Sequence, residues 1–212
     1  MIKLRKKKEN ESINITVQSI DAGHHKVSYR GIKAIRCPFD YLIYQMIISE
    51  IQPDLVIEIG TRKGGGAFYI ADLLENIGKG VVHTIDIVDE VEQVVKEHKR
   101  IEFFTNGWSG YDINLAKKYD KIIIIEDSSH LYQDTIGALN KFNELIPVGS
   151  YFIIEDGIIN ELGLEKKYNG GPLRAIREFL PAHPEYIIDR KWCDMFGTNA
   201  TFNVNGYLKK IK

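Results

Sequence analysis

Residues 55–77 read LVIEIGTRKGGGAFYIADLLENI, and the pattern changes twice along this stretch. Residues 55–59 form a short apolar run that suits a buried strand, and glycines cluster at 60–66. Residues 66–77 then repeat their apolar side chains at helical spacing. The stretch therefore predicts a strand, a glycine-rich loop and a helix in succession, which is the repeating unit of a parallel α/β sheet.

The rest of the chain continues this alternation. Helices are expected over 39–51, 89–98, 111–118, 131–145 and 172–180, and further strands over 81–86, 101–104, 121–126, 151–155, 186–189 and 202–209. Asp40 is a candidate cap for the first of these helices. Apolar strands separated by helices indicate a mainly parallel sheet that is covered by helices on both faces.

The composition is that of a globular domain, with 212 residues, 44% hydrophobic and 27% charged. The two cysteines, Cys37 and Cys193, cannot form a disulfide framework or a four-cysteine zinc site, so we expect reduced thiols. No apolar run approaches the roughly 18 residues of a membrane span. The N-terminus lacks the apolar core of a secretory signal, which favours a cytoplasmic location.

Charge is distributed unevenly. Residues 1–36 hold nine Lys and Arg against three Asp and Glu, whereas the remainder holds 19 against 26. We divide the chain into a basic N-terminal arm, 1–30, and a catalytic domain, 31–212. Such an arm is often only a solvated terminus, but it can also contact nucleic acid, acidic lipid or an acidic subunit. Because no nucleic-acid-binding motif accompanies it, we exclude nucleic acid and expect a homo-oligomer.

Parallel sheets bind ligands beyond the carboxyl ends of their strands. The strand at 55–59 contains Glu58 and leads into glycines spaced G-x-x-x-G-G, not the G-x-G-x-x-G of dinucleotide-binding loops. An acid in this place would repel a phosphate but suits a cationic ligand with a free amine, such as S-adenosylmethionine. A tight turn beside a surface glutamate is the simpler alternative.

Two later strand ends extend this interpretation. Asp86 lies 26 residues after Gly60, where an acid can bind both ribose hydroxyls of a nucleoside. Trp108 could stack on adenine and Ser109 could bond its edge, although Trp108 could equally be a core residue. The predicted cofactor-binding residues are Glu58, Gly60, Thr61, Gly64, Gly65, Asp86, Trp108 and Ser109.

Three acids follow the next two strands, Asp127 after one and the pair Glu155 and Asp156 after the other. Neighbouring strands lie about 4.8 Å apart, so these carboxylates can converge, and converging carboxylates repel unless a cation or proton lies between them. We therefore predict that Asp127, Glu155 and Asp156 bind Mg²⁺ or another divalent cation, with solvated acids as the alternative. His130, three residues after Asp127, is the candidate general base, unless it is an ordinary loop residue.

Several segments, in this order, resemble the cephalosporin hydroxylase/rhamnosyl O-methyltransferase family from about residue 30 onward. They are GIKAIRCPFD at 31–40, EDSSH at 126–130, GSYFIIED at 149–156, GGPLRAIREFLPAHPEY at 170–186 and NVNGYLKK at 203–210. The resemblance implies a Rossmann-like class I methyltransferase that binds S-adenosylmethionine and a divalent metal. In that fold a mainly parallel seven-stranded sheet has an antiparallel last strand, here expected at 202–209 beside 151–155.

The resemblance also implies the activity, methylation of a hydroxyl group on a sugar or another small natural product. Its metal ligands follow strands four and five, the places of Asp127, Glu155 and Asp156. His130 stands where the similarly built catechol O-methyltransferases have a lysine base, and the loop at 157–171 is a candidate lid. An Fe(II)-dependent hydroxylase, which usually binds its metal with two histidines and one carboxylate, and a non-catalytic binding module are the alternatives.

Overall fold

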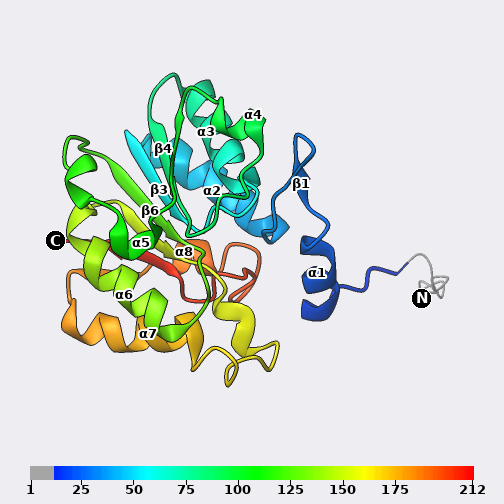
Figure 1. The fold of residues 1–212 in the computed structure, drawn as a ribbon. Coiled ribbons are helices and arrows are strands. Elements are labelled where there is room, and N and C mark those ends of the chain that lie inside the picture. The colour runs from blue at the N-terminus through cyan, green and yellow to red at the C-terminus, as the bar shows by residue number, and fades with distance from the viewer. Residues whose placement is uncertain (1–11) are drawn as a thin grey trace, which may run out of the picture.

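The computed structural model describes residues 12–212, so the basic run at 3–8 lies outside the described residues (Figure 1). A seven-stranded sheet has the order β5-β4-β3-β6-β7-β9-β8. The first five strands in this order are parallel, and β9 pairs antiparallel with both β7 and β8. The strands are β3 Leu55–Ile59, β4 Val81–Ile85, β5 Ile101–Phe104, β6 Ile122–Glu126, β7 Tyr151–Ile154, β8 Tyr186–Ile188 and β9 Tyr207–Lys210.

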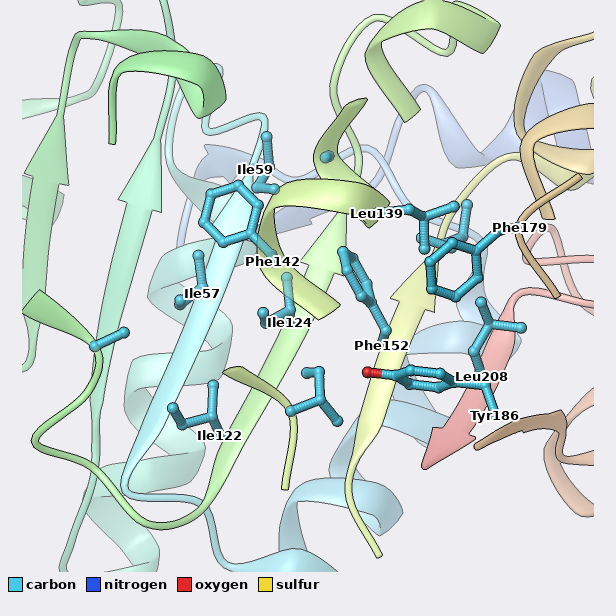
Figure 2. Close-up of a cluster of buried hydrophobic side chains, with 14 of the residues drawn as sticks. Ile57, Ile59, Ile122, Ile124, Leu139, Phe142, Phe152, Phe179, Tyr186 and Leu208 are labelled. Atoms are coloured by element: carbon cyan, nitrogen blue, oxygen red, sulfur yellow. The ribbon is translucent and has the colours of Figure 1, made fainter. Parts of the chain in front are cut away.

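Helices cover both faces of this sheet because the side chains of its central strands alternate between two apolar clusters. Ile57 and Ile124 belong to the cluster that includes residues of α6 Tyr132–Phe142 and α7 Gly171–Phe179, as Figure 2 shows in part. The neighbouring residues of the same strands join the second cluster, which is shared with α2 Pro38–Ile51 and α3 Gly65–Ile77. The predicted layers and the predicted antiparallel last strand are confirmed.

Some elements are shorter than predicted. The charged helix expected at 89–98 is reduced to α4 Gln93–Lys96. The helix expected at 111–118 is wrong: the Asp112 side chain accepts the backbone N–H of Asn114 and starts only a 3-10 turn, Ile113–Leu115, which follows the short helix α5 Gly107–Gly110. The strand expected from 202 begins at Tyr207, because the preceding residues instead surround Asp40.

The N-terminal elements are α1 Val17–His24 and a two-stranded hairpin, β1 Ser28–Tyr29 and β2 Ile32–Lys33. Apolar side chains of α1 pack against a small cluster that includes Ile158 and Phe202, so α1 lies beside the loop that follows β7. A further short helix, α8 Arg190–Cys193, precedes β9. Between residues 12 and 212 we find no helix with the length and apolar character to span a membrane.

Candidate functional site

A cavity of about 600 Å³ lies at the carboxyl ends of β3, β4, β6 and β7. This is the edge at which parallel α/β sheets bind ligands. The residues predicted for the site that line this cavity are Glu58, Gly60, Thr61, Gly65, Asp86, Trp108, Asp127, His130, Glu155 and Asp156. Gly64 and Ser109 do not line it. Residues from five strand ends, β5 included, thus meet in one place.

The glycine loop permits two strand ends to approach closely. Gly60 has φ of +105°, and a Cβ atom there would lie 1.9 Å from the backbone oxygen of Asp127. Gly64, with φ of +86°, faces away from the cavity, since a Cβ atom there would lie 2.8 Å from Val95 of α4. Gly60 therefore sets the distance between β3 and β6, and Gly64 supports the loop from below.

Glu58 is buried beneath the start of α3. Its Oε2 accepts a hydrogen bond from Thr84 Oγ1 at 2.7 Å, and Thr84 in turn lies 2.7 Å from the Thr61 hydroxyl. A Cβ atom on Gly66 would lie 2.4 Å from Glu58 Oε1, so the residue above the carboxylate must be small. Burial raises the pKa of Glu58 to about 7, although the nearby Arg36 opposes this shift. Glu58 thus lines the cavity from beneath the loop.

Asp86 is oriented by the main chain. Its Oδ2 accepts the N–H of Arg62 at 2.8 Å, and its Oδ1 accepts the N–H of Ile87 at 2.7 Å. Oδ1 also accepts the N–H of Val88 at 3.3 Å. A carboxylate has four lone-pair sites, so Asp86 keeps one, on Oδ2, for a ligand. The next strand end contributes Trp108, whose ring lies against Gly137 of α6 and whose Nε1 donates to Asp134 at 3.4 Å.

Ser109 turns away from the cavity: it is exposed, and its carbonyl oxygen accepts a hydrogen bond from Lys141 Nζ at 2.7 Å. The predicted adenine contact of Ser109 therefore has no support in this geometry. Trp108, by contrast, is both a packed residue and a residue of the cavity wall, because its ring contacts α6 and also lines the cavity.

Asp127, His130 and Asp156 come together at the cavity wall. One ligand atom from each lies within 4.8 Å of the others, and His130 Nδ1 lies 3.2 Å from Asp156 Oδ2. Burial, together with the charges of Glu155 and Asp156, raises the pKa of Asp127 well above its usual range. The two carboxylates repel each other unless a cation or proton lies between them. Two carboxylates and an imidazole are also ligand types that suit a divalent cation.

The backbone at two of these residues is strained. His130 and Asp156 have φ of 60° and 56°, in the left-handed region that side chains other than glycine rarely adopt. Such positions cost of order 1–3 kcal/mol each and persist only where surrounding contacts hold them. The two residues with this backbone conformation are also the ones whose imidazole and carboxylate lie 3.2 Å apart.

Glu155 is directed elsewhere. Its Oε1 lies 2.7 Å from Arg36 Nη2 and accepts the Tyr44 hydroxyl at 2.7 Å, while its Oε2 accepts Arg36 Nε at 3.2 Å. Burial alone would lower the pKa of the Arg36 guanidinium, but Glu155 and its neighbours raise it well above the ordinary value. Arg36 is therefore a buried cation of the site, and sequence reasoning missed it. The only signal was a single arginine in the apolar segment before α2.

A buried polar network supports Glu155 from behind. Asp40 was expected to cap α2, but Cys37 occupies the N-cap position, and the Asp40 carboxylate instead accepts the N–H of Phe202 at 3.0 Å and the Tyr207 hydroxyl at 2.8 Å. Asn203 Nδ2 bonds the hydroxyls of Tyr207 and Tyr44, at 3.2 and 3.1 Å. Hydrogen bonds therefore run from Asp40 through β9 and its preceding turn to Tyr44, and on to Glu155.

The fold defines a class of protein. The order of the seven-stranded sheet and its antiparallel β9 are those of a Rossmann-like class I methyltransferase.

The chain belongs to the Rhamnosyl O-methyltransferase/CmcI family, whose sequence model matches residues 22–211. Rhamnosyl O-methyltransferases of Mycobacterium bovis and Mycobacterium leprae are each 30% identical to it, over 195 and 192 residues. These alignments cover 86% and 85% of this chain and 78% and 82% of the two relatives. The predicted family and the prediction of an O-methyltransferase are confirmed.

Solved structures agree on the fold. A Mg- and SAM-containing structure of CmcI superimposes with a TM-score of 0.66 at 21% identity, covering 89% of this chain and 78% of that one. An O-methyltransferase from Bacillus cereus in complex with SAH gives a TM-score of 0.54 at 16% identity, covering 92% and 88%. At these identities the likeness establishes the fold alone.

Proposed function

We propose that this enzyme methylates a hydroxyl group of a sugar or another small natural product, using S-adenosylmethionine and a divalent cation, of which Mg²⁺ is the first candidate. The observation that carries the proposal is the convergence of Asp127, His130 and Asp156 in the cavity that also contains the glycine loop. Relatives named rhamnosyl O-methyltransferases and a CmcI structure with Mg and SAM support it.

The cofactor side of the cavity is formed by the ends of β3 and β4. We assign cofactor binding to the predicted residues that line the cavity there, namely Glu58, Gly60, Thr61, Gly65, Asp86 and Trp108. The acceptor site that Asp86 keeps on Oδ2 suits one ribose hydroxyl, and binding of both would displace the 3.3 Å contact of Oδ1 with the N–H of Val88. The buried charge of Glu58, beneath the loop, favours a cationic ligand over a phosphate.

The metal side is formed by the ends of β6 and β7. The proposed ligands are Asp127, Glu155 and Asp156. Arg36 and Tyr44 take three of the four lone-pair sites of Glu155, so Glu155 must give up contacts with Arg36 to bind the ion with both oxygens. When bound, the ion supplies a Lewis acid that lowers the pKa of the acceptor hydroxyl, and the cofactor supplies the electrophilic methyl group. A pair of adjacent hydroxyls, as in a sugar, suits chelation by such an ion.

His130 is the proposed base. Its Nδ1 is held beside Asp156, which leaves Nε2 to accept the proton of the acceptor hydroxyl. Asp127 is the second proposed catalytic residue, because it would hold the ion to which the acceptor hydroxyl binds. The loop at 157–171 is the proposed lid. It begins directly after Asp156 and its Tyr168 ring lies 5.7 Å from the His130 ring, which supports closure over the acceptor.

The test is methyl transfer from labelled S-adenosylmethionine to a panel of sugars, sugar nucleotides and phenols, with added Mg²⁺ or with EDTA. We expect transfer to a hydroxyl acceptor that EDTA abolishes and Mg²⁺ restores. S-adenosylhomocysteine should raise the melting temperature, and NAD should not. Full activity in EDTA would remove the metal from the proposal, and activity that only Fe(II) with oxygen restores would favour a hydroxylase.

Two further predictions remain proposals. A cytoplasmic location is consistent with Cys37 and Cys193, which are both buried and free. The homo-oligomer rests on the charge asymmetry of residues 1–36. Because α1 packs on the domain, the clean test is a truncation that starts at Ser12 and keeps this helix. An unchanged particle size in light scattering would contradict a role for the basic run in assembly.

A further inference from the structure

Arg36 occupies an unusual place among the carboxylates of the site. Its side chain is 3% exposed, and its Nη2 lies 2.7 Å from Glu155 Oε1 and 3.5 Å from both Asp127 Oδ2 and Glu58 Oε1. The guanidinium also lies over the Tyr44 ring, 4.8 Å from the ring centroid. One cationic group thus faces carboxylates from three strand ends.

The role of Arg36 is not that of a fully bonded structural arginine. Its Nη1 is buried without a hydrogen-bond partner among residues 12–212. A buried donor left unpaired is costly, so the position has to be explained by the charge that the group supplies. Without a cation, the carboxylates of Glu58, Asp127 and Glu155 would repel one another in a region of low dielectric constant.

We propose that Arg36 is a positioning residue that stands in for the divalent cation and competes with it for Glu155. This inference rests on the proposed metal site. In the structure both Glu155 oxygens are held by Arg36, and Tyr44 adds a third hydrogen bond. A cation bound at Asp127 and Asp156 meets a positive charge that already lies 3.5 Å from Asp127. Three of the four lone-pair sites of Glu155 are taken by Arg36 and Tyr44, so Glu155 can bind the cation with both oxygens only if the arginine contact breaks.

Two consequences have opposite signs. Arg36 keeps the acidic site assembled when no metal is present, so the native protein should not need metal to fold. The same charge weakens metal binding, because like charges repel and because Glu155 is already paired. If Arg36 only shaped the site for the metal, its removal would weaken metal binding instead of strengthening it.

The experiment measures Mn²⁺ binding to the cofactor-free full chain, by electron paramagnetic resonance of the free ion, with Mg²⁺ as competitor. The variant Arg36→Met is compared with the native protein, with Arg36→Lys, which keeps the charge but loses the two-pronged contact, and with Arg62→Met. Arg62 lines the same cavity, is exposed, and its side chain forms no ion pair with the described residues. Asp156→Asn reports whether binding occurs at the proposed site.

We expect Arg36→Met to bind Mn²⁺ at least about tenfold more tightly than the native protein. Arg36→Lys should fall between the two, and Arg62→Met should stay within twofold of native. Urea unfolding of Arg36→Met should depend strongly on Mg²⁺, while that of the native protein depends on it weakly. If Arg36→Met does not fold, Tyr44→Phe is the variant that tests the competition. It removes one hydrogen bond to Glu155 and should tighten Mn²⁺ binding by about threefold.

Unchanged or weaker binding in Arg36→Met, or in Tyr44→Phe where that variant decides, overturns the competition. In that event the proposed function still stands if the native protein binds Mn²⁺ and Asp156→Asn does not. Native protein that binds no Mn²⁺, or binds it equally well as Asp156→Asn, overturns the proposed metal site itself, and the inference falls with it.

Discussion

The two halves of the cavity are built in different ways. At the cofactor half, the hydrogen bonds come from neighbouring loops and strands: Asp86 accepts the N–H groups of Arg62 and Ile87, and Glu58 accepts the Thr84 hydroxyl, with Arg36 a further 3.5 Å contact of Glu58. At the metal half, Glu155 is held by Arg36 and Tyr44, more than 100 residues earlier in the chain. The hydrogen bonds of the cofactor half therefore join neighbouring elements, whereas the position of Glu155 in the metal half depends on a segment that is distant in sequence.

The largest expected effect separates the two halves. Asp156→Ala removes a proposed ligand and leaves the other carboxylates to repel one another, so turnover should fall by about 10³-fold or more. Cofactor affinity, measured by calorimetry, should remain near native, because the cofactor is held at the other half. If Asp156→Ala lost both, the halves would not be independent.

The next effect sharpens the role of the metal half. His130→Ala should lower turnover by about 10²- to 10³-fold through loss of the base, with little change in cofactor affinity. His25→Ala is the matched control, since His25 is exposed and lines the same cavity. Equal losses in the two variants would remove His130 from the mechanism.

The supporting network makes stability depend on pH. Burial raises the pKa of Asp40 to about 7, against an ordinary value near 3.8. The folded state therefore holds a proton that the unfolded state has lost, and this contribution to stability declines as pH rises from about 4 to about 7. In Asp40→Asn, a neutral side chain of similar shape, this part of the decline is absent.

Urea unfolding of both proteins at pH 5 and pH 8 tests this difference. The free energy of unfolding of the native protein, relative to Asp40→Asn, should be lower at pH 8 by about 2–3 kcal/mol. Other buried acids such as Glu58 titrate in both proteins, so their contributions cancel in the comparison. Parallel pH profiles would show that Asp40 is not protonated in the folded protein.

The smallest expected effect belongs to the cofactor half. Asp86→Ala should weaken the binding of S-adenosylhomocysteine by about 1.5–3 kcal/mol, the range for hydrogen bonds to a charged group. Mn²⁺ binding should not change. Asp89→Ala, an exposed acid that pairs with Lys96, serves as the control. Native affinity in Asp86→Ala would contradict the ribose assignment.

The same contrast explains what the sequence could predict. The strands at 55–59, 101–104 and 122–126 were expected within a residue of their bounds, because their apolar runs are bounded by glycine, charge or turn residues. The site residues at strand ends followed from them, since every carboxyl end of a parallel strand lies at one edge. Gly64 was predicted to line the cavity but packs against α4 instead, because spacing alone does not show which glycine of the loop faces the ligand.

Arg36 and Asp40 could not be assigned in this way. Neither ends a strand, and their partners, such as Glu155 and Tyr207, are distant in sequence. Asp40 occupies a position that is typical of a helix cap, so the local pattern favoured the wrong partner. Such pairings are decided by tertiary packing, which a single sequence does not display.

The position of β9 has a consequence for biosynthesis. The final strand lies inside the sheet, between β7 and β8, and Gly206 packs so closely on β7 that a Cβ atom would lie 1.9 Å from the Ile154 oxygen. A ribosome releases these residues after β7 and β8, between which they insert, although Asp40, which they contact, leaves the tunnel much earlier. A nascent or C-terminally cleaved chain therefore carries a buried acid without its partners and an open sheet edge. The network that supports Glu155 can therefore form only after β9 has been synthesised and has inserted between β7 and β8.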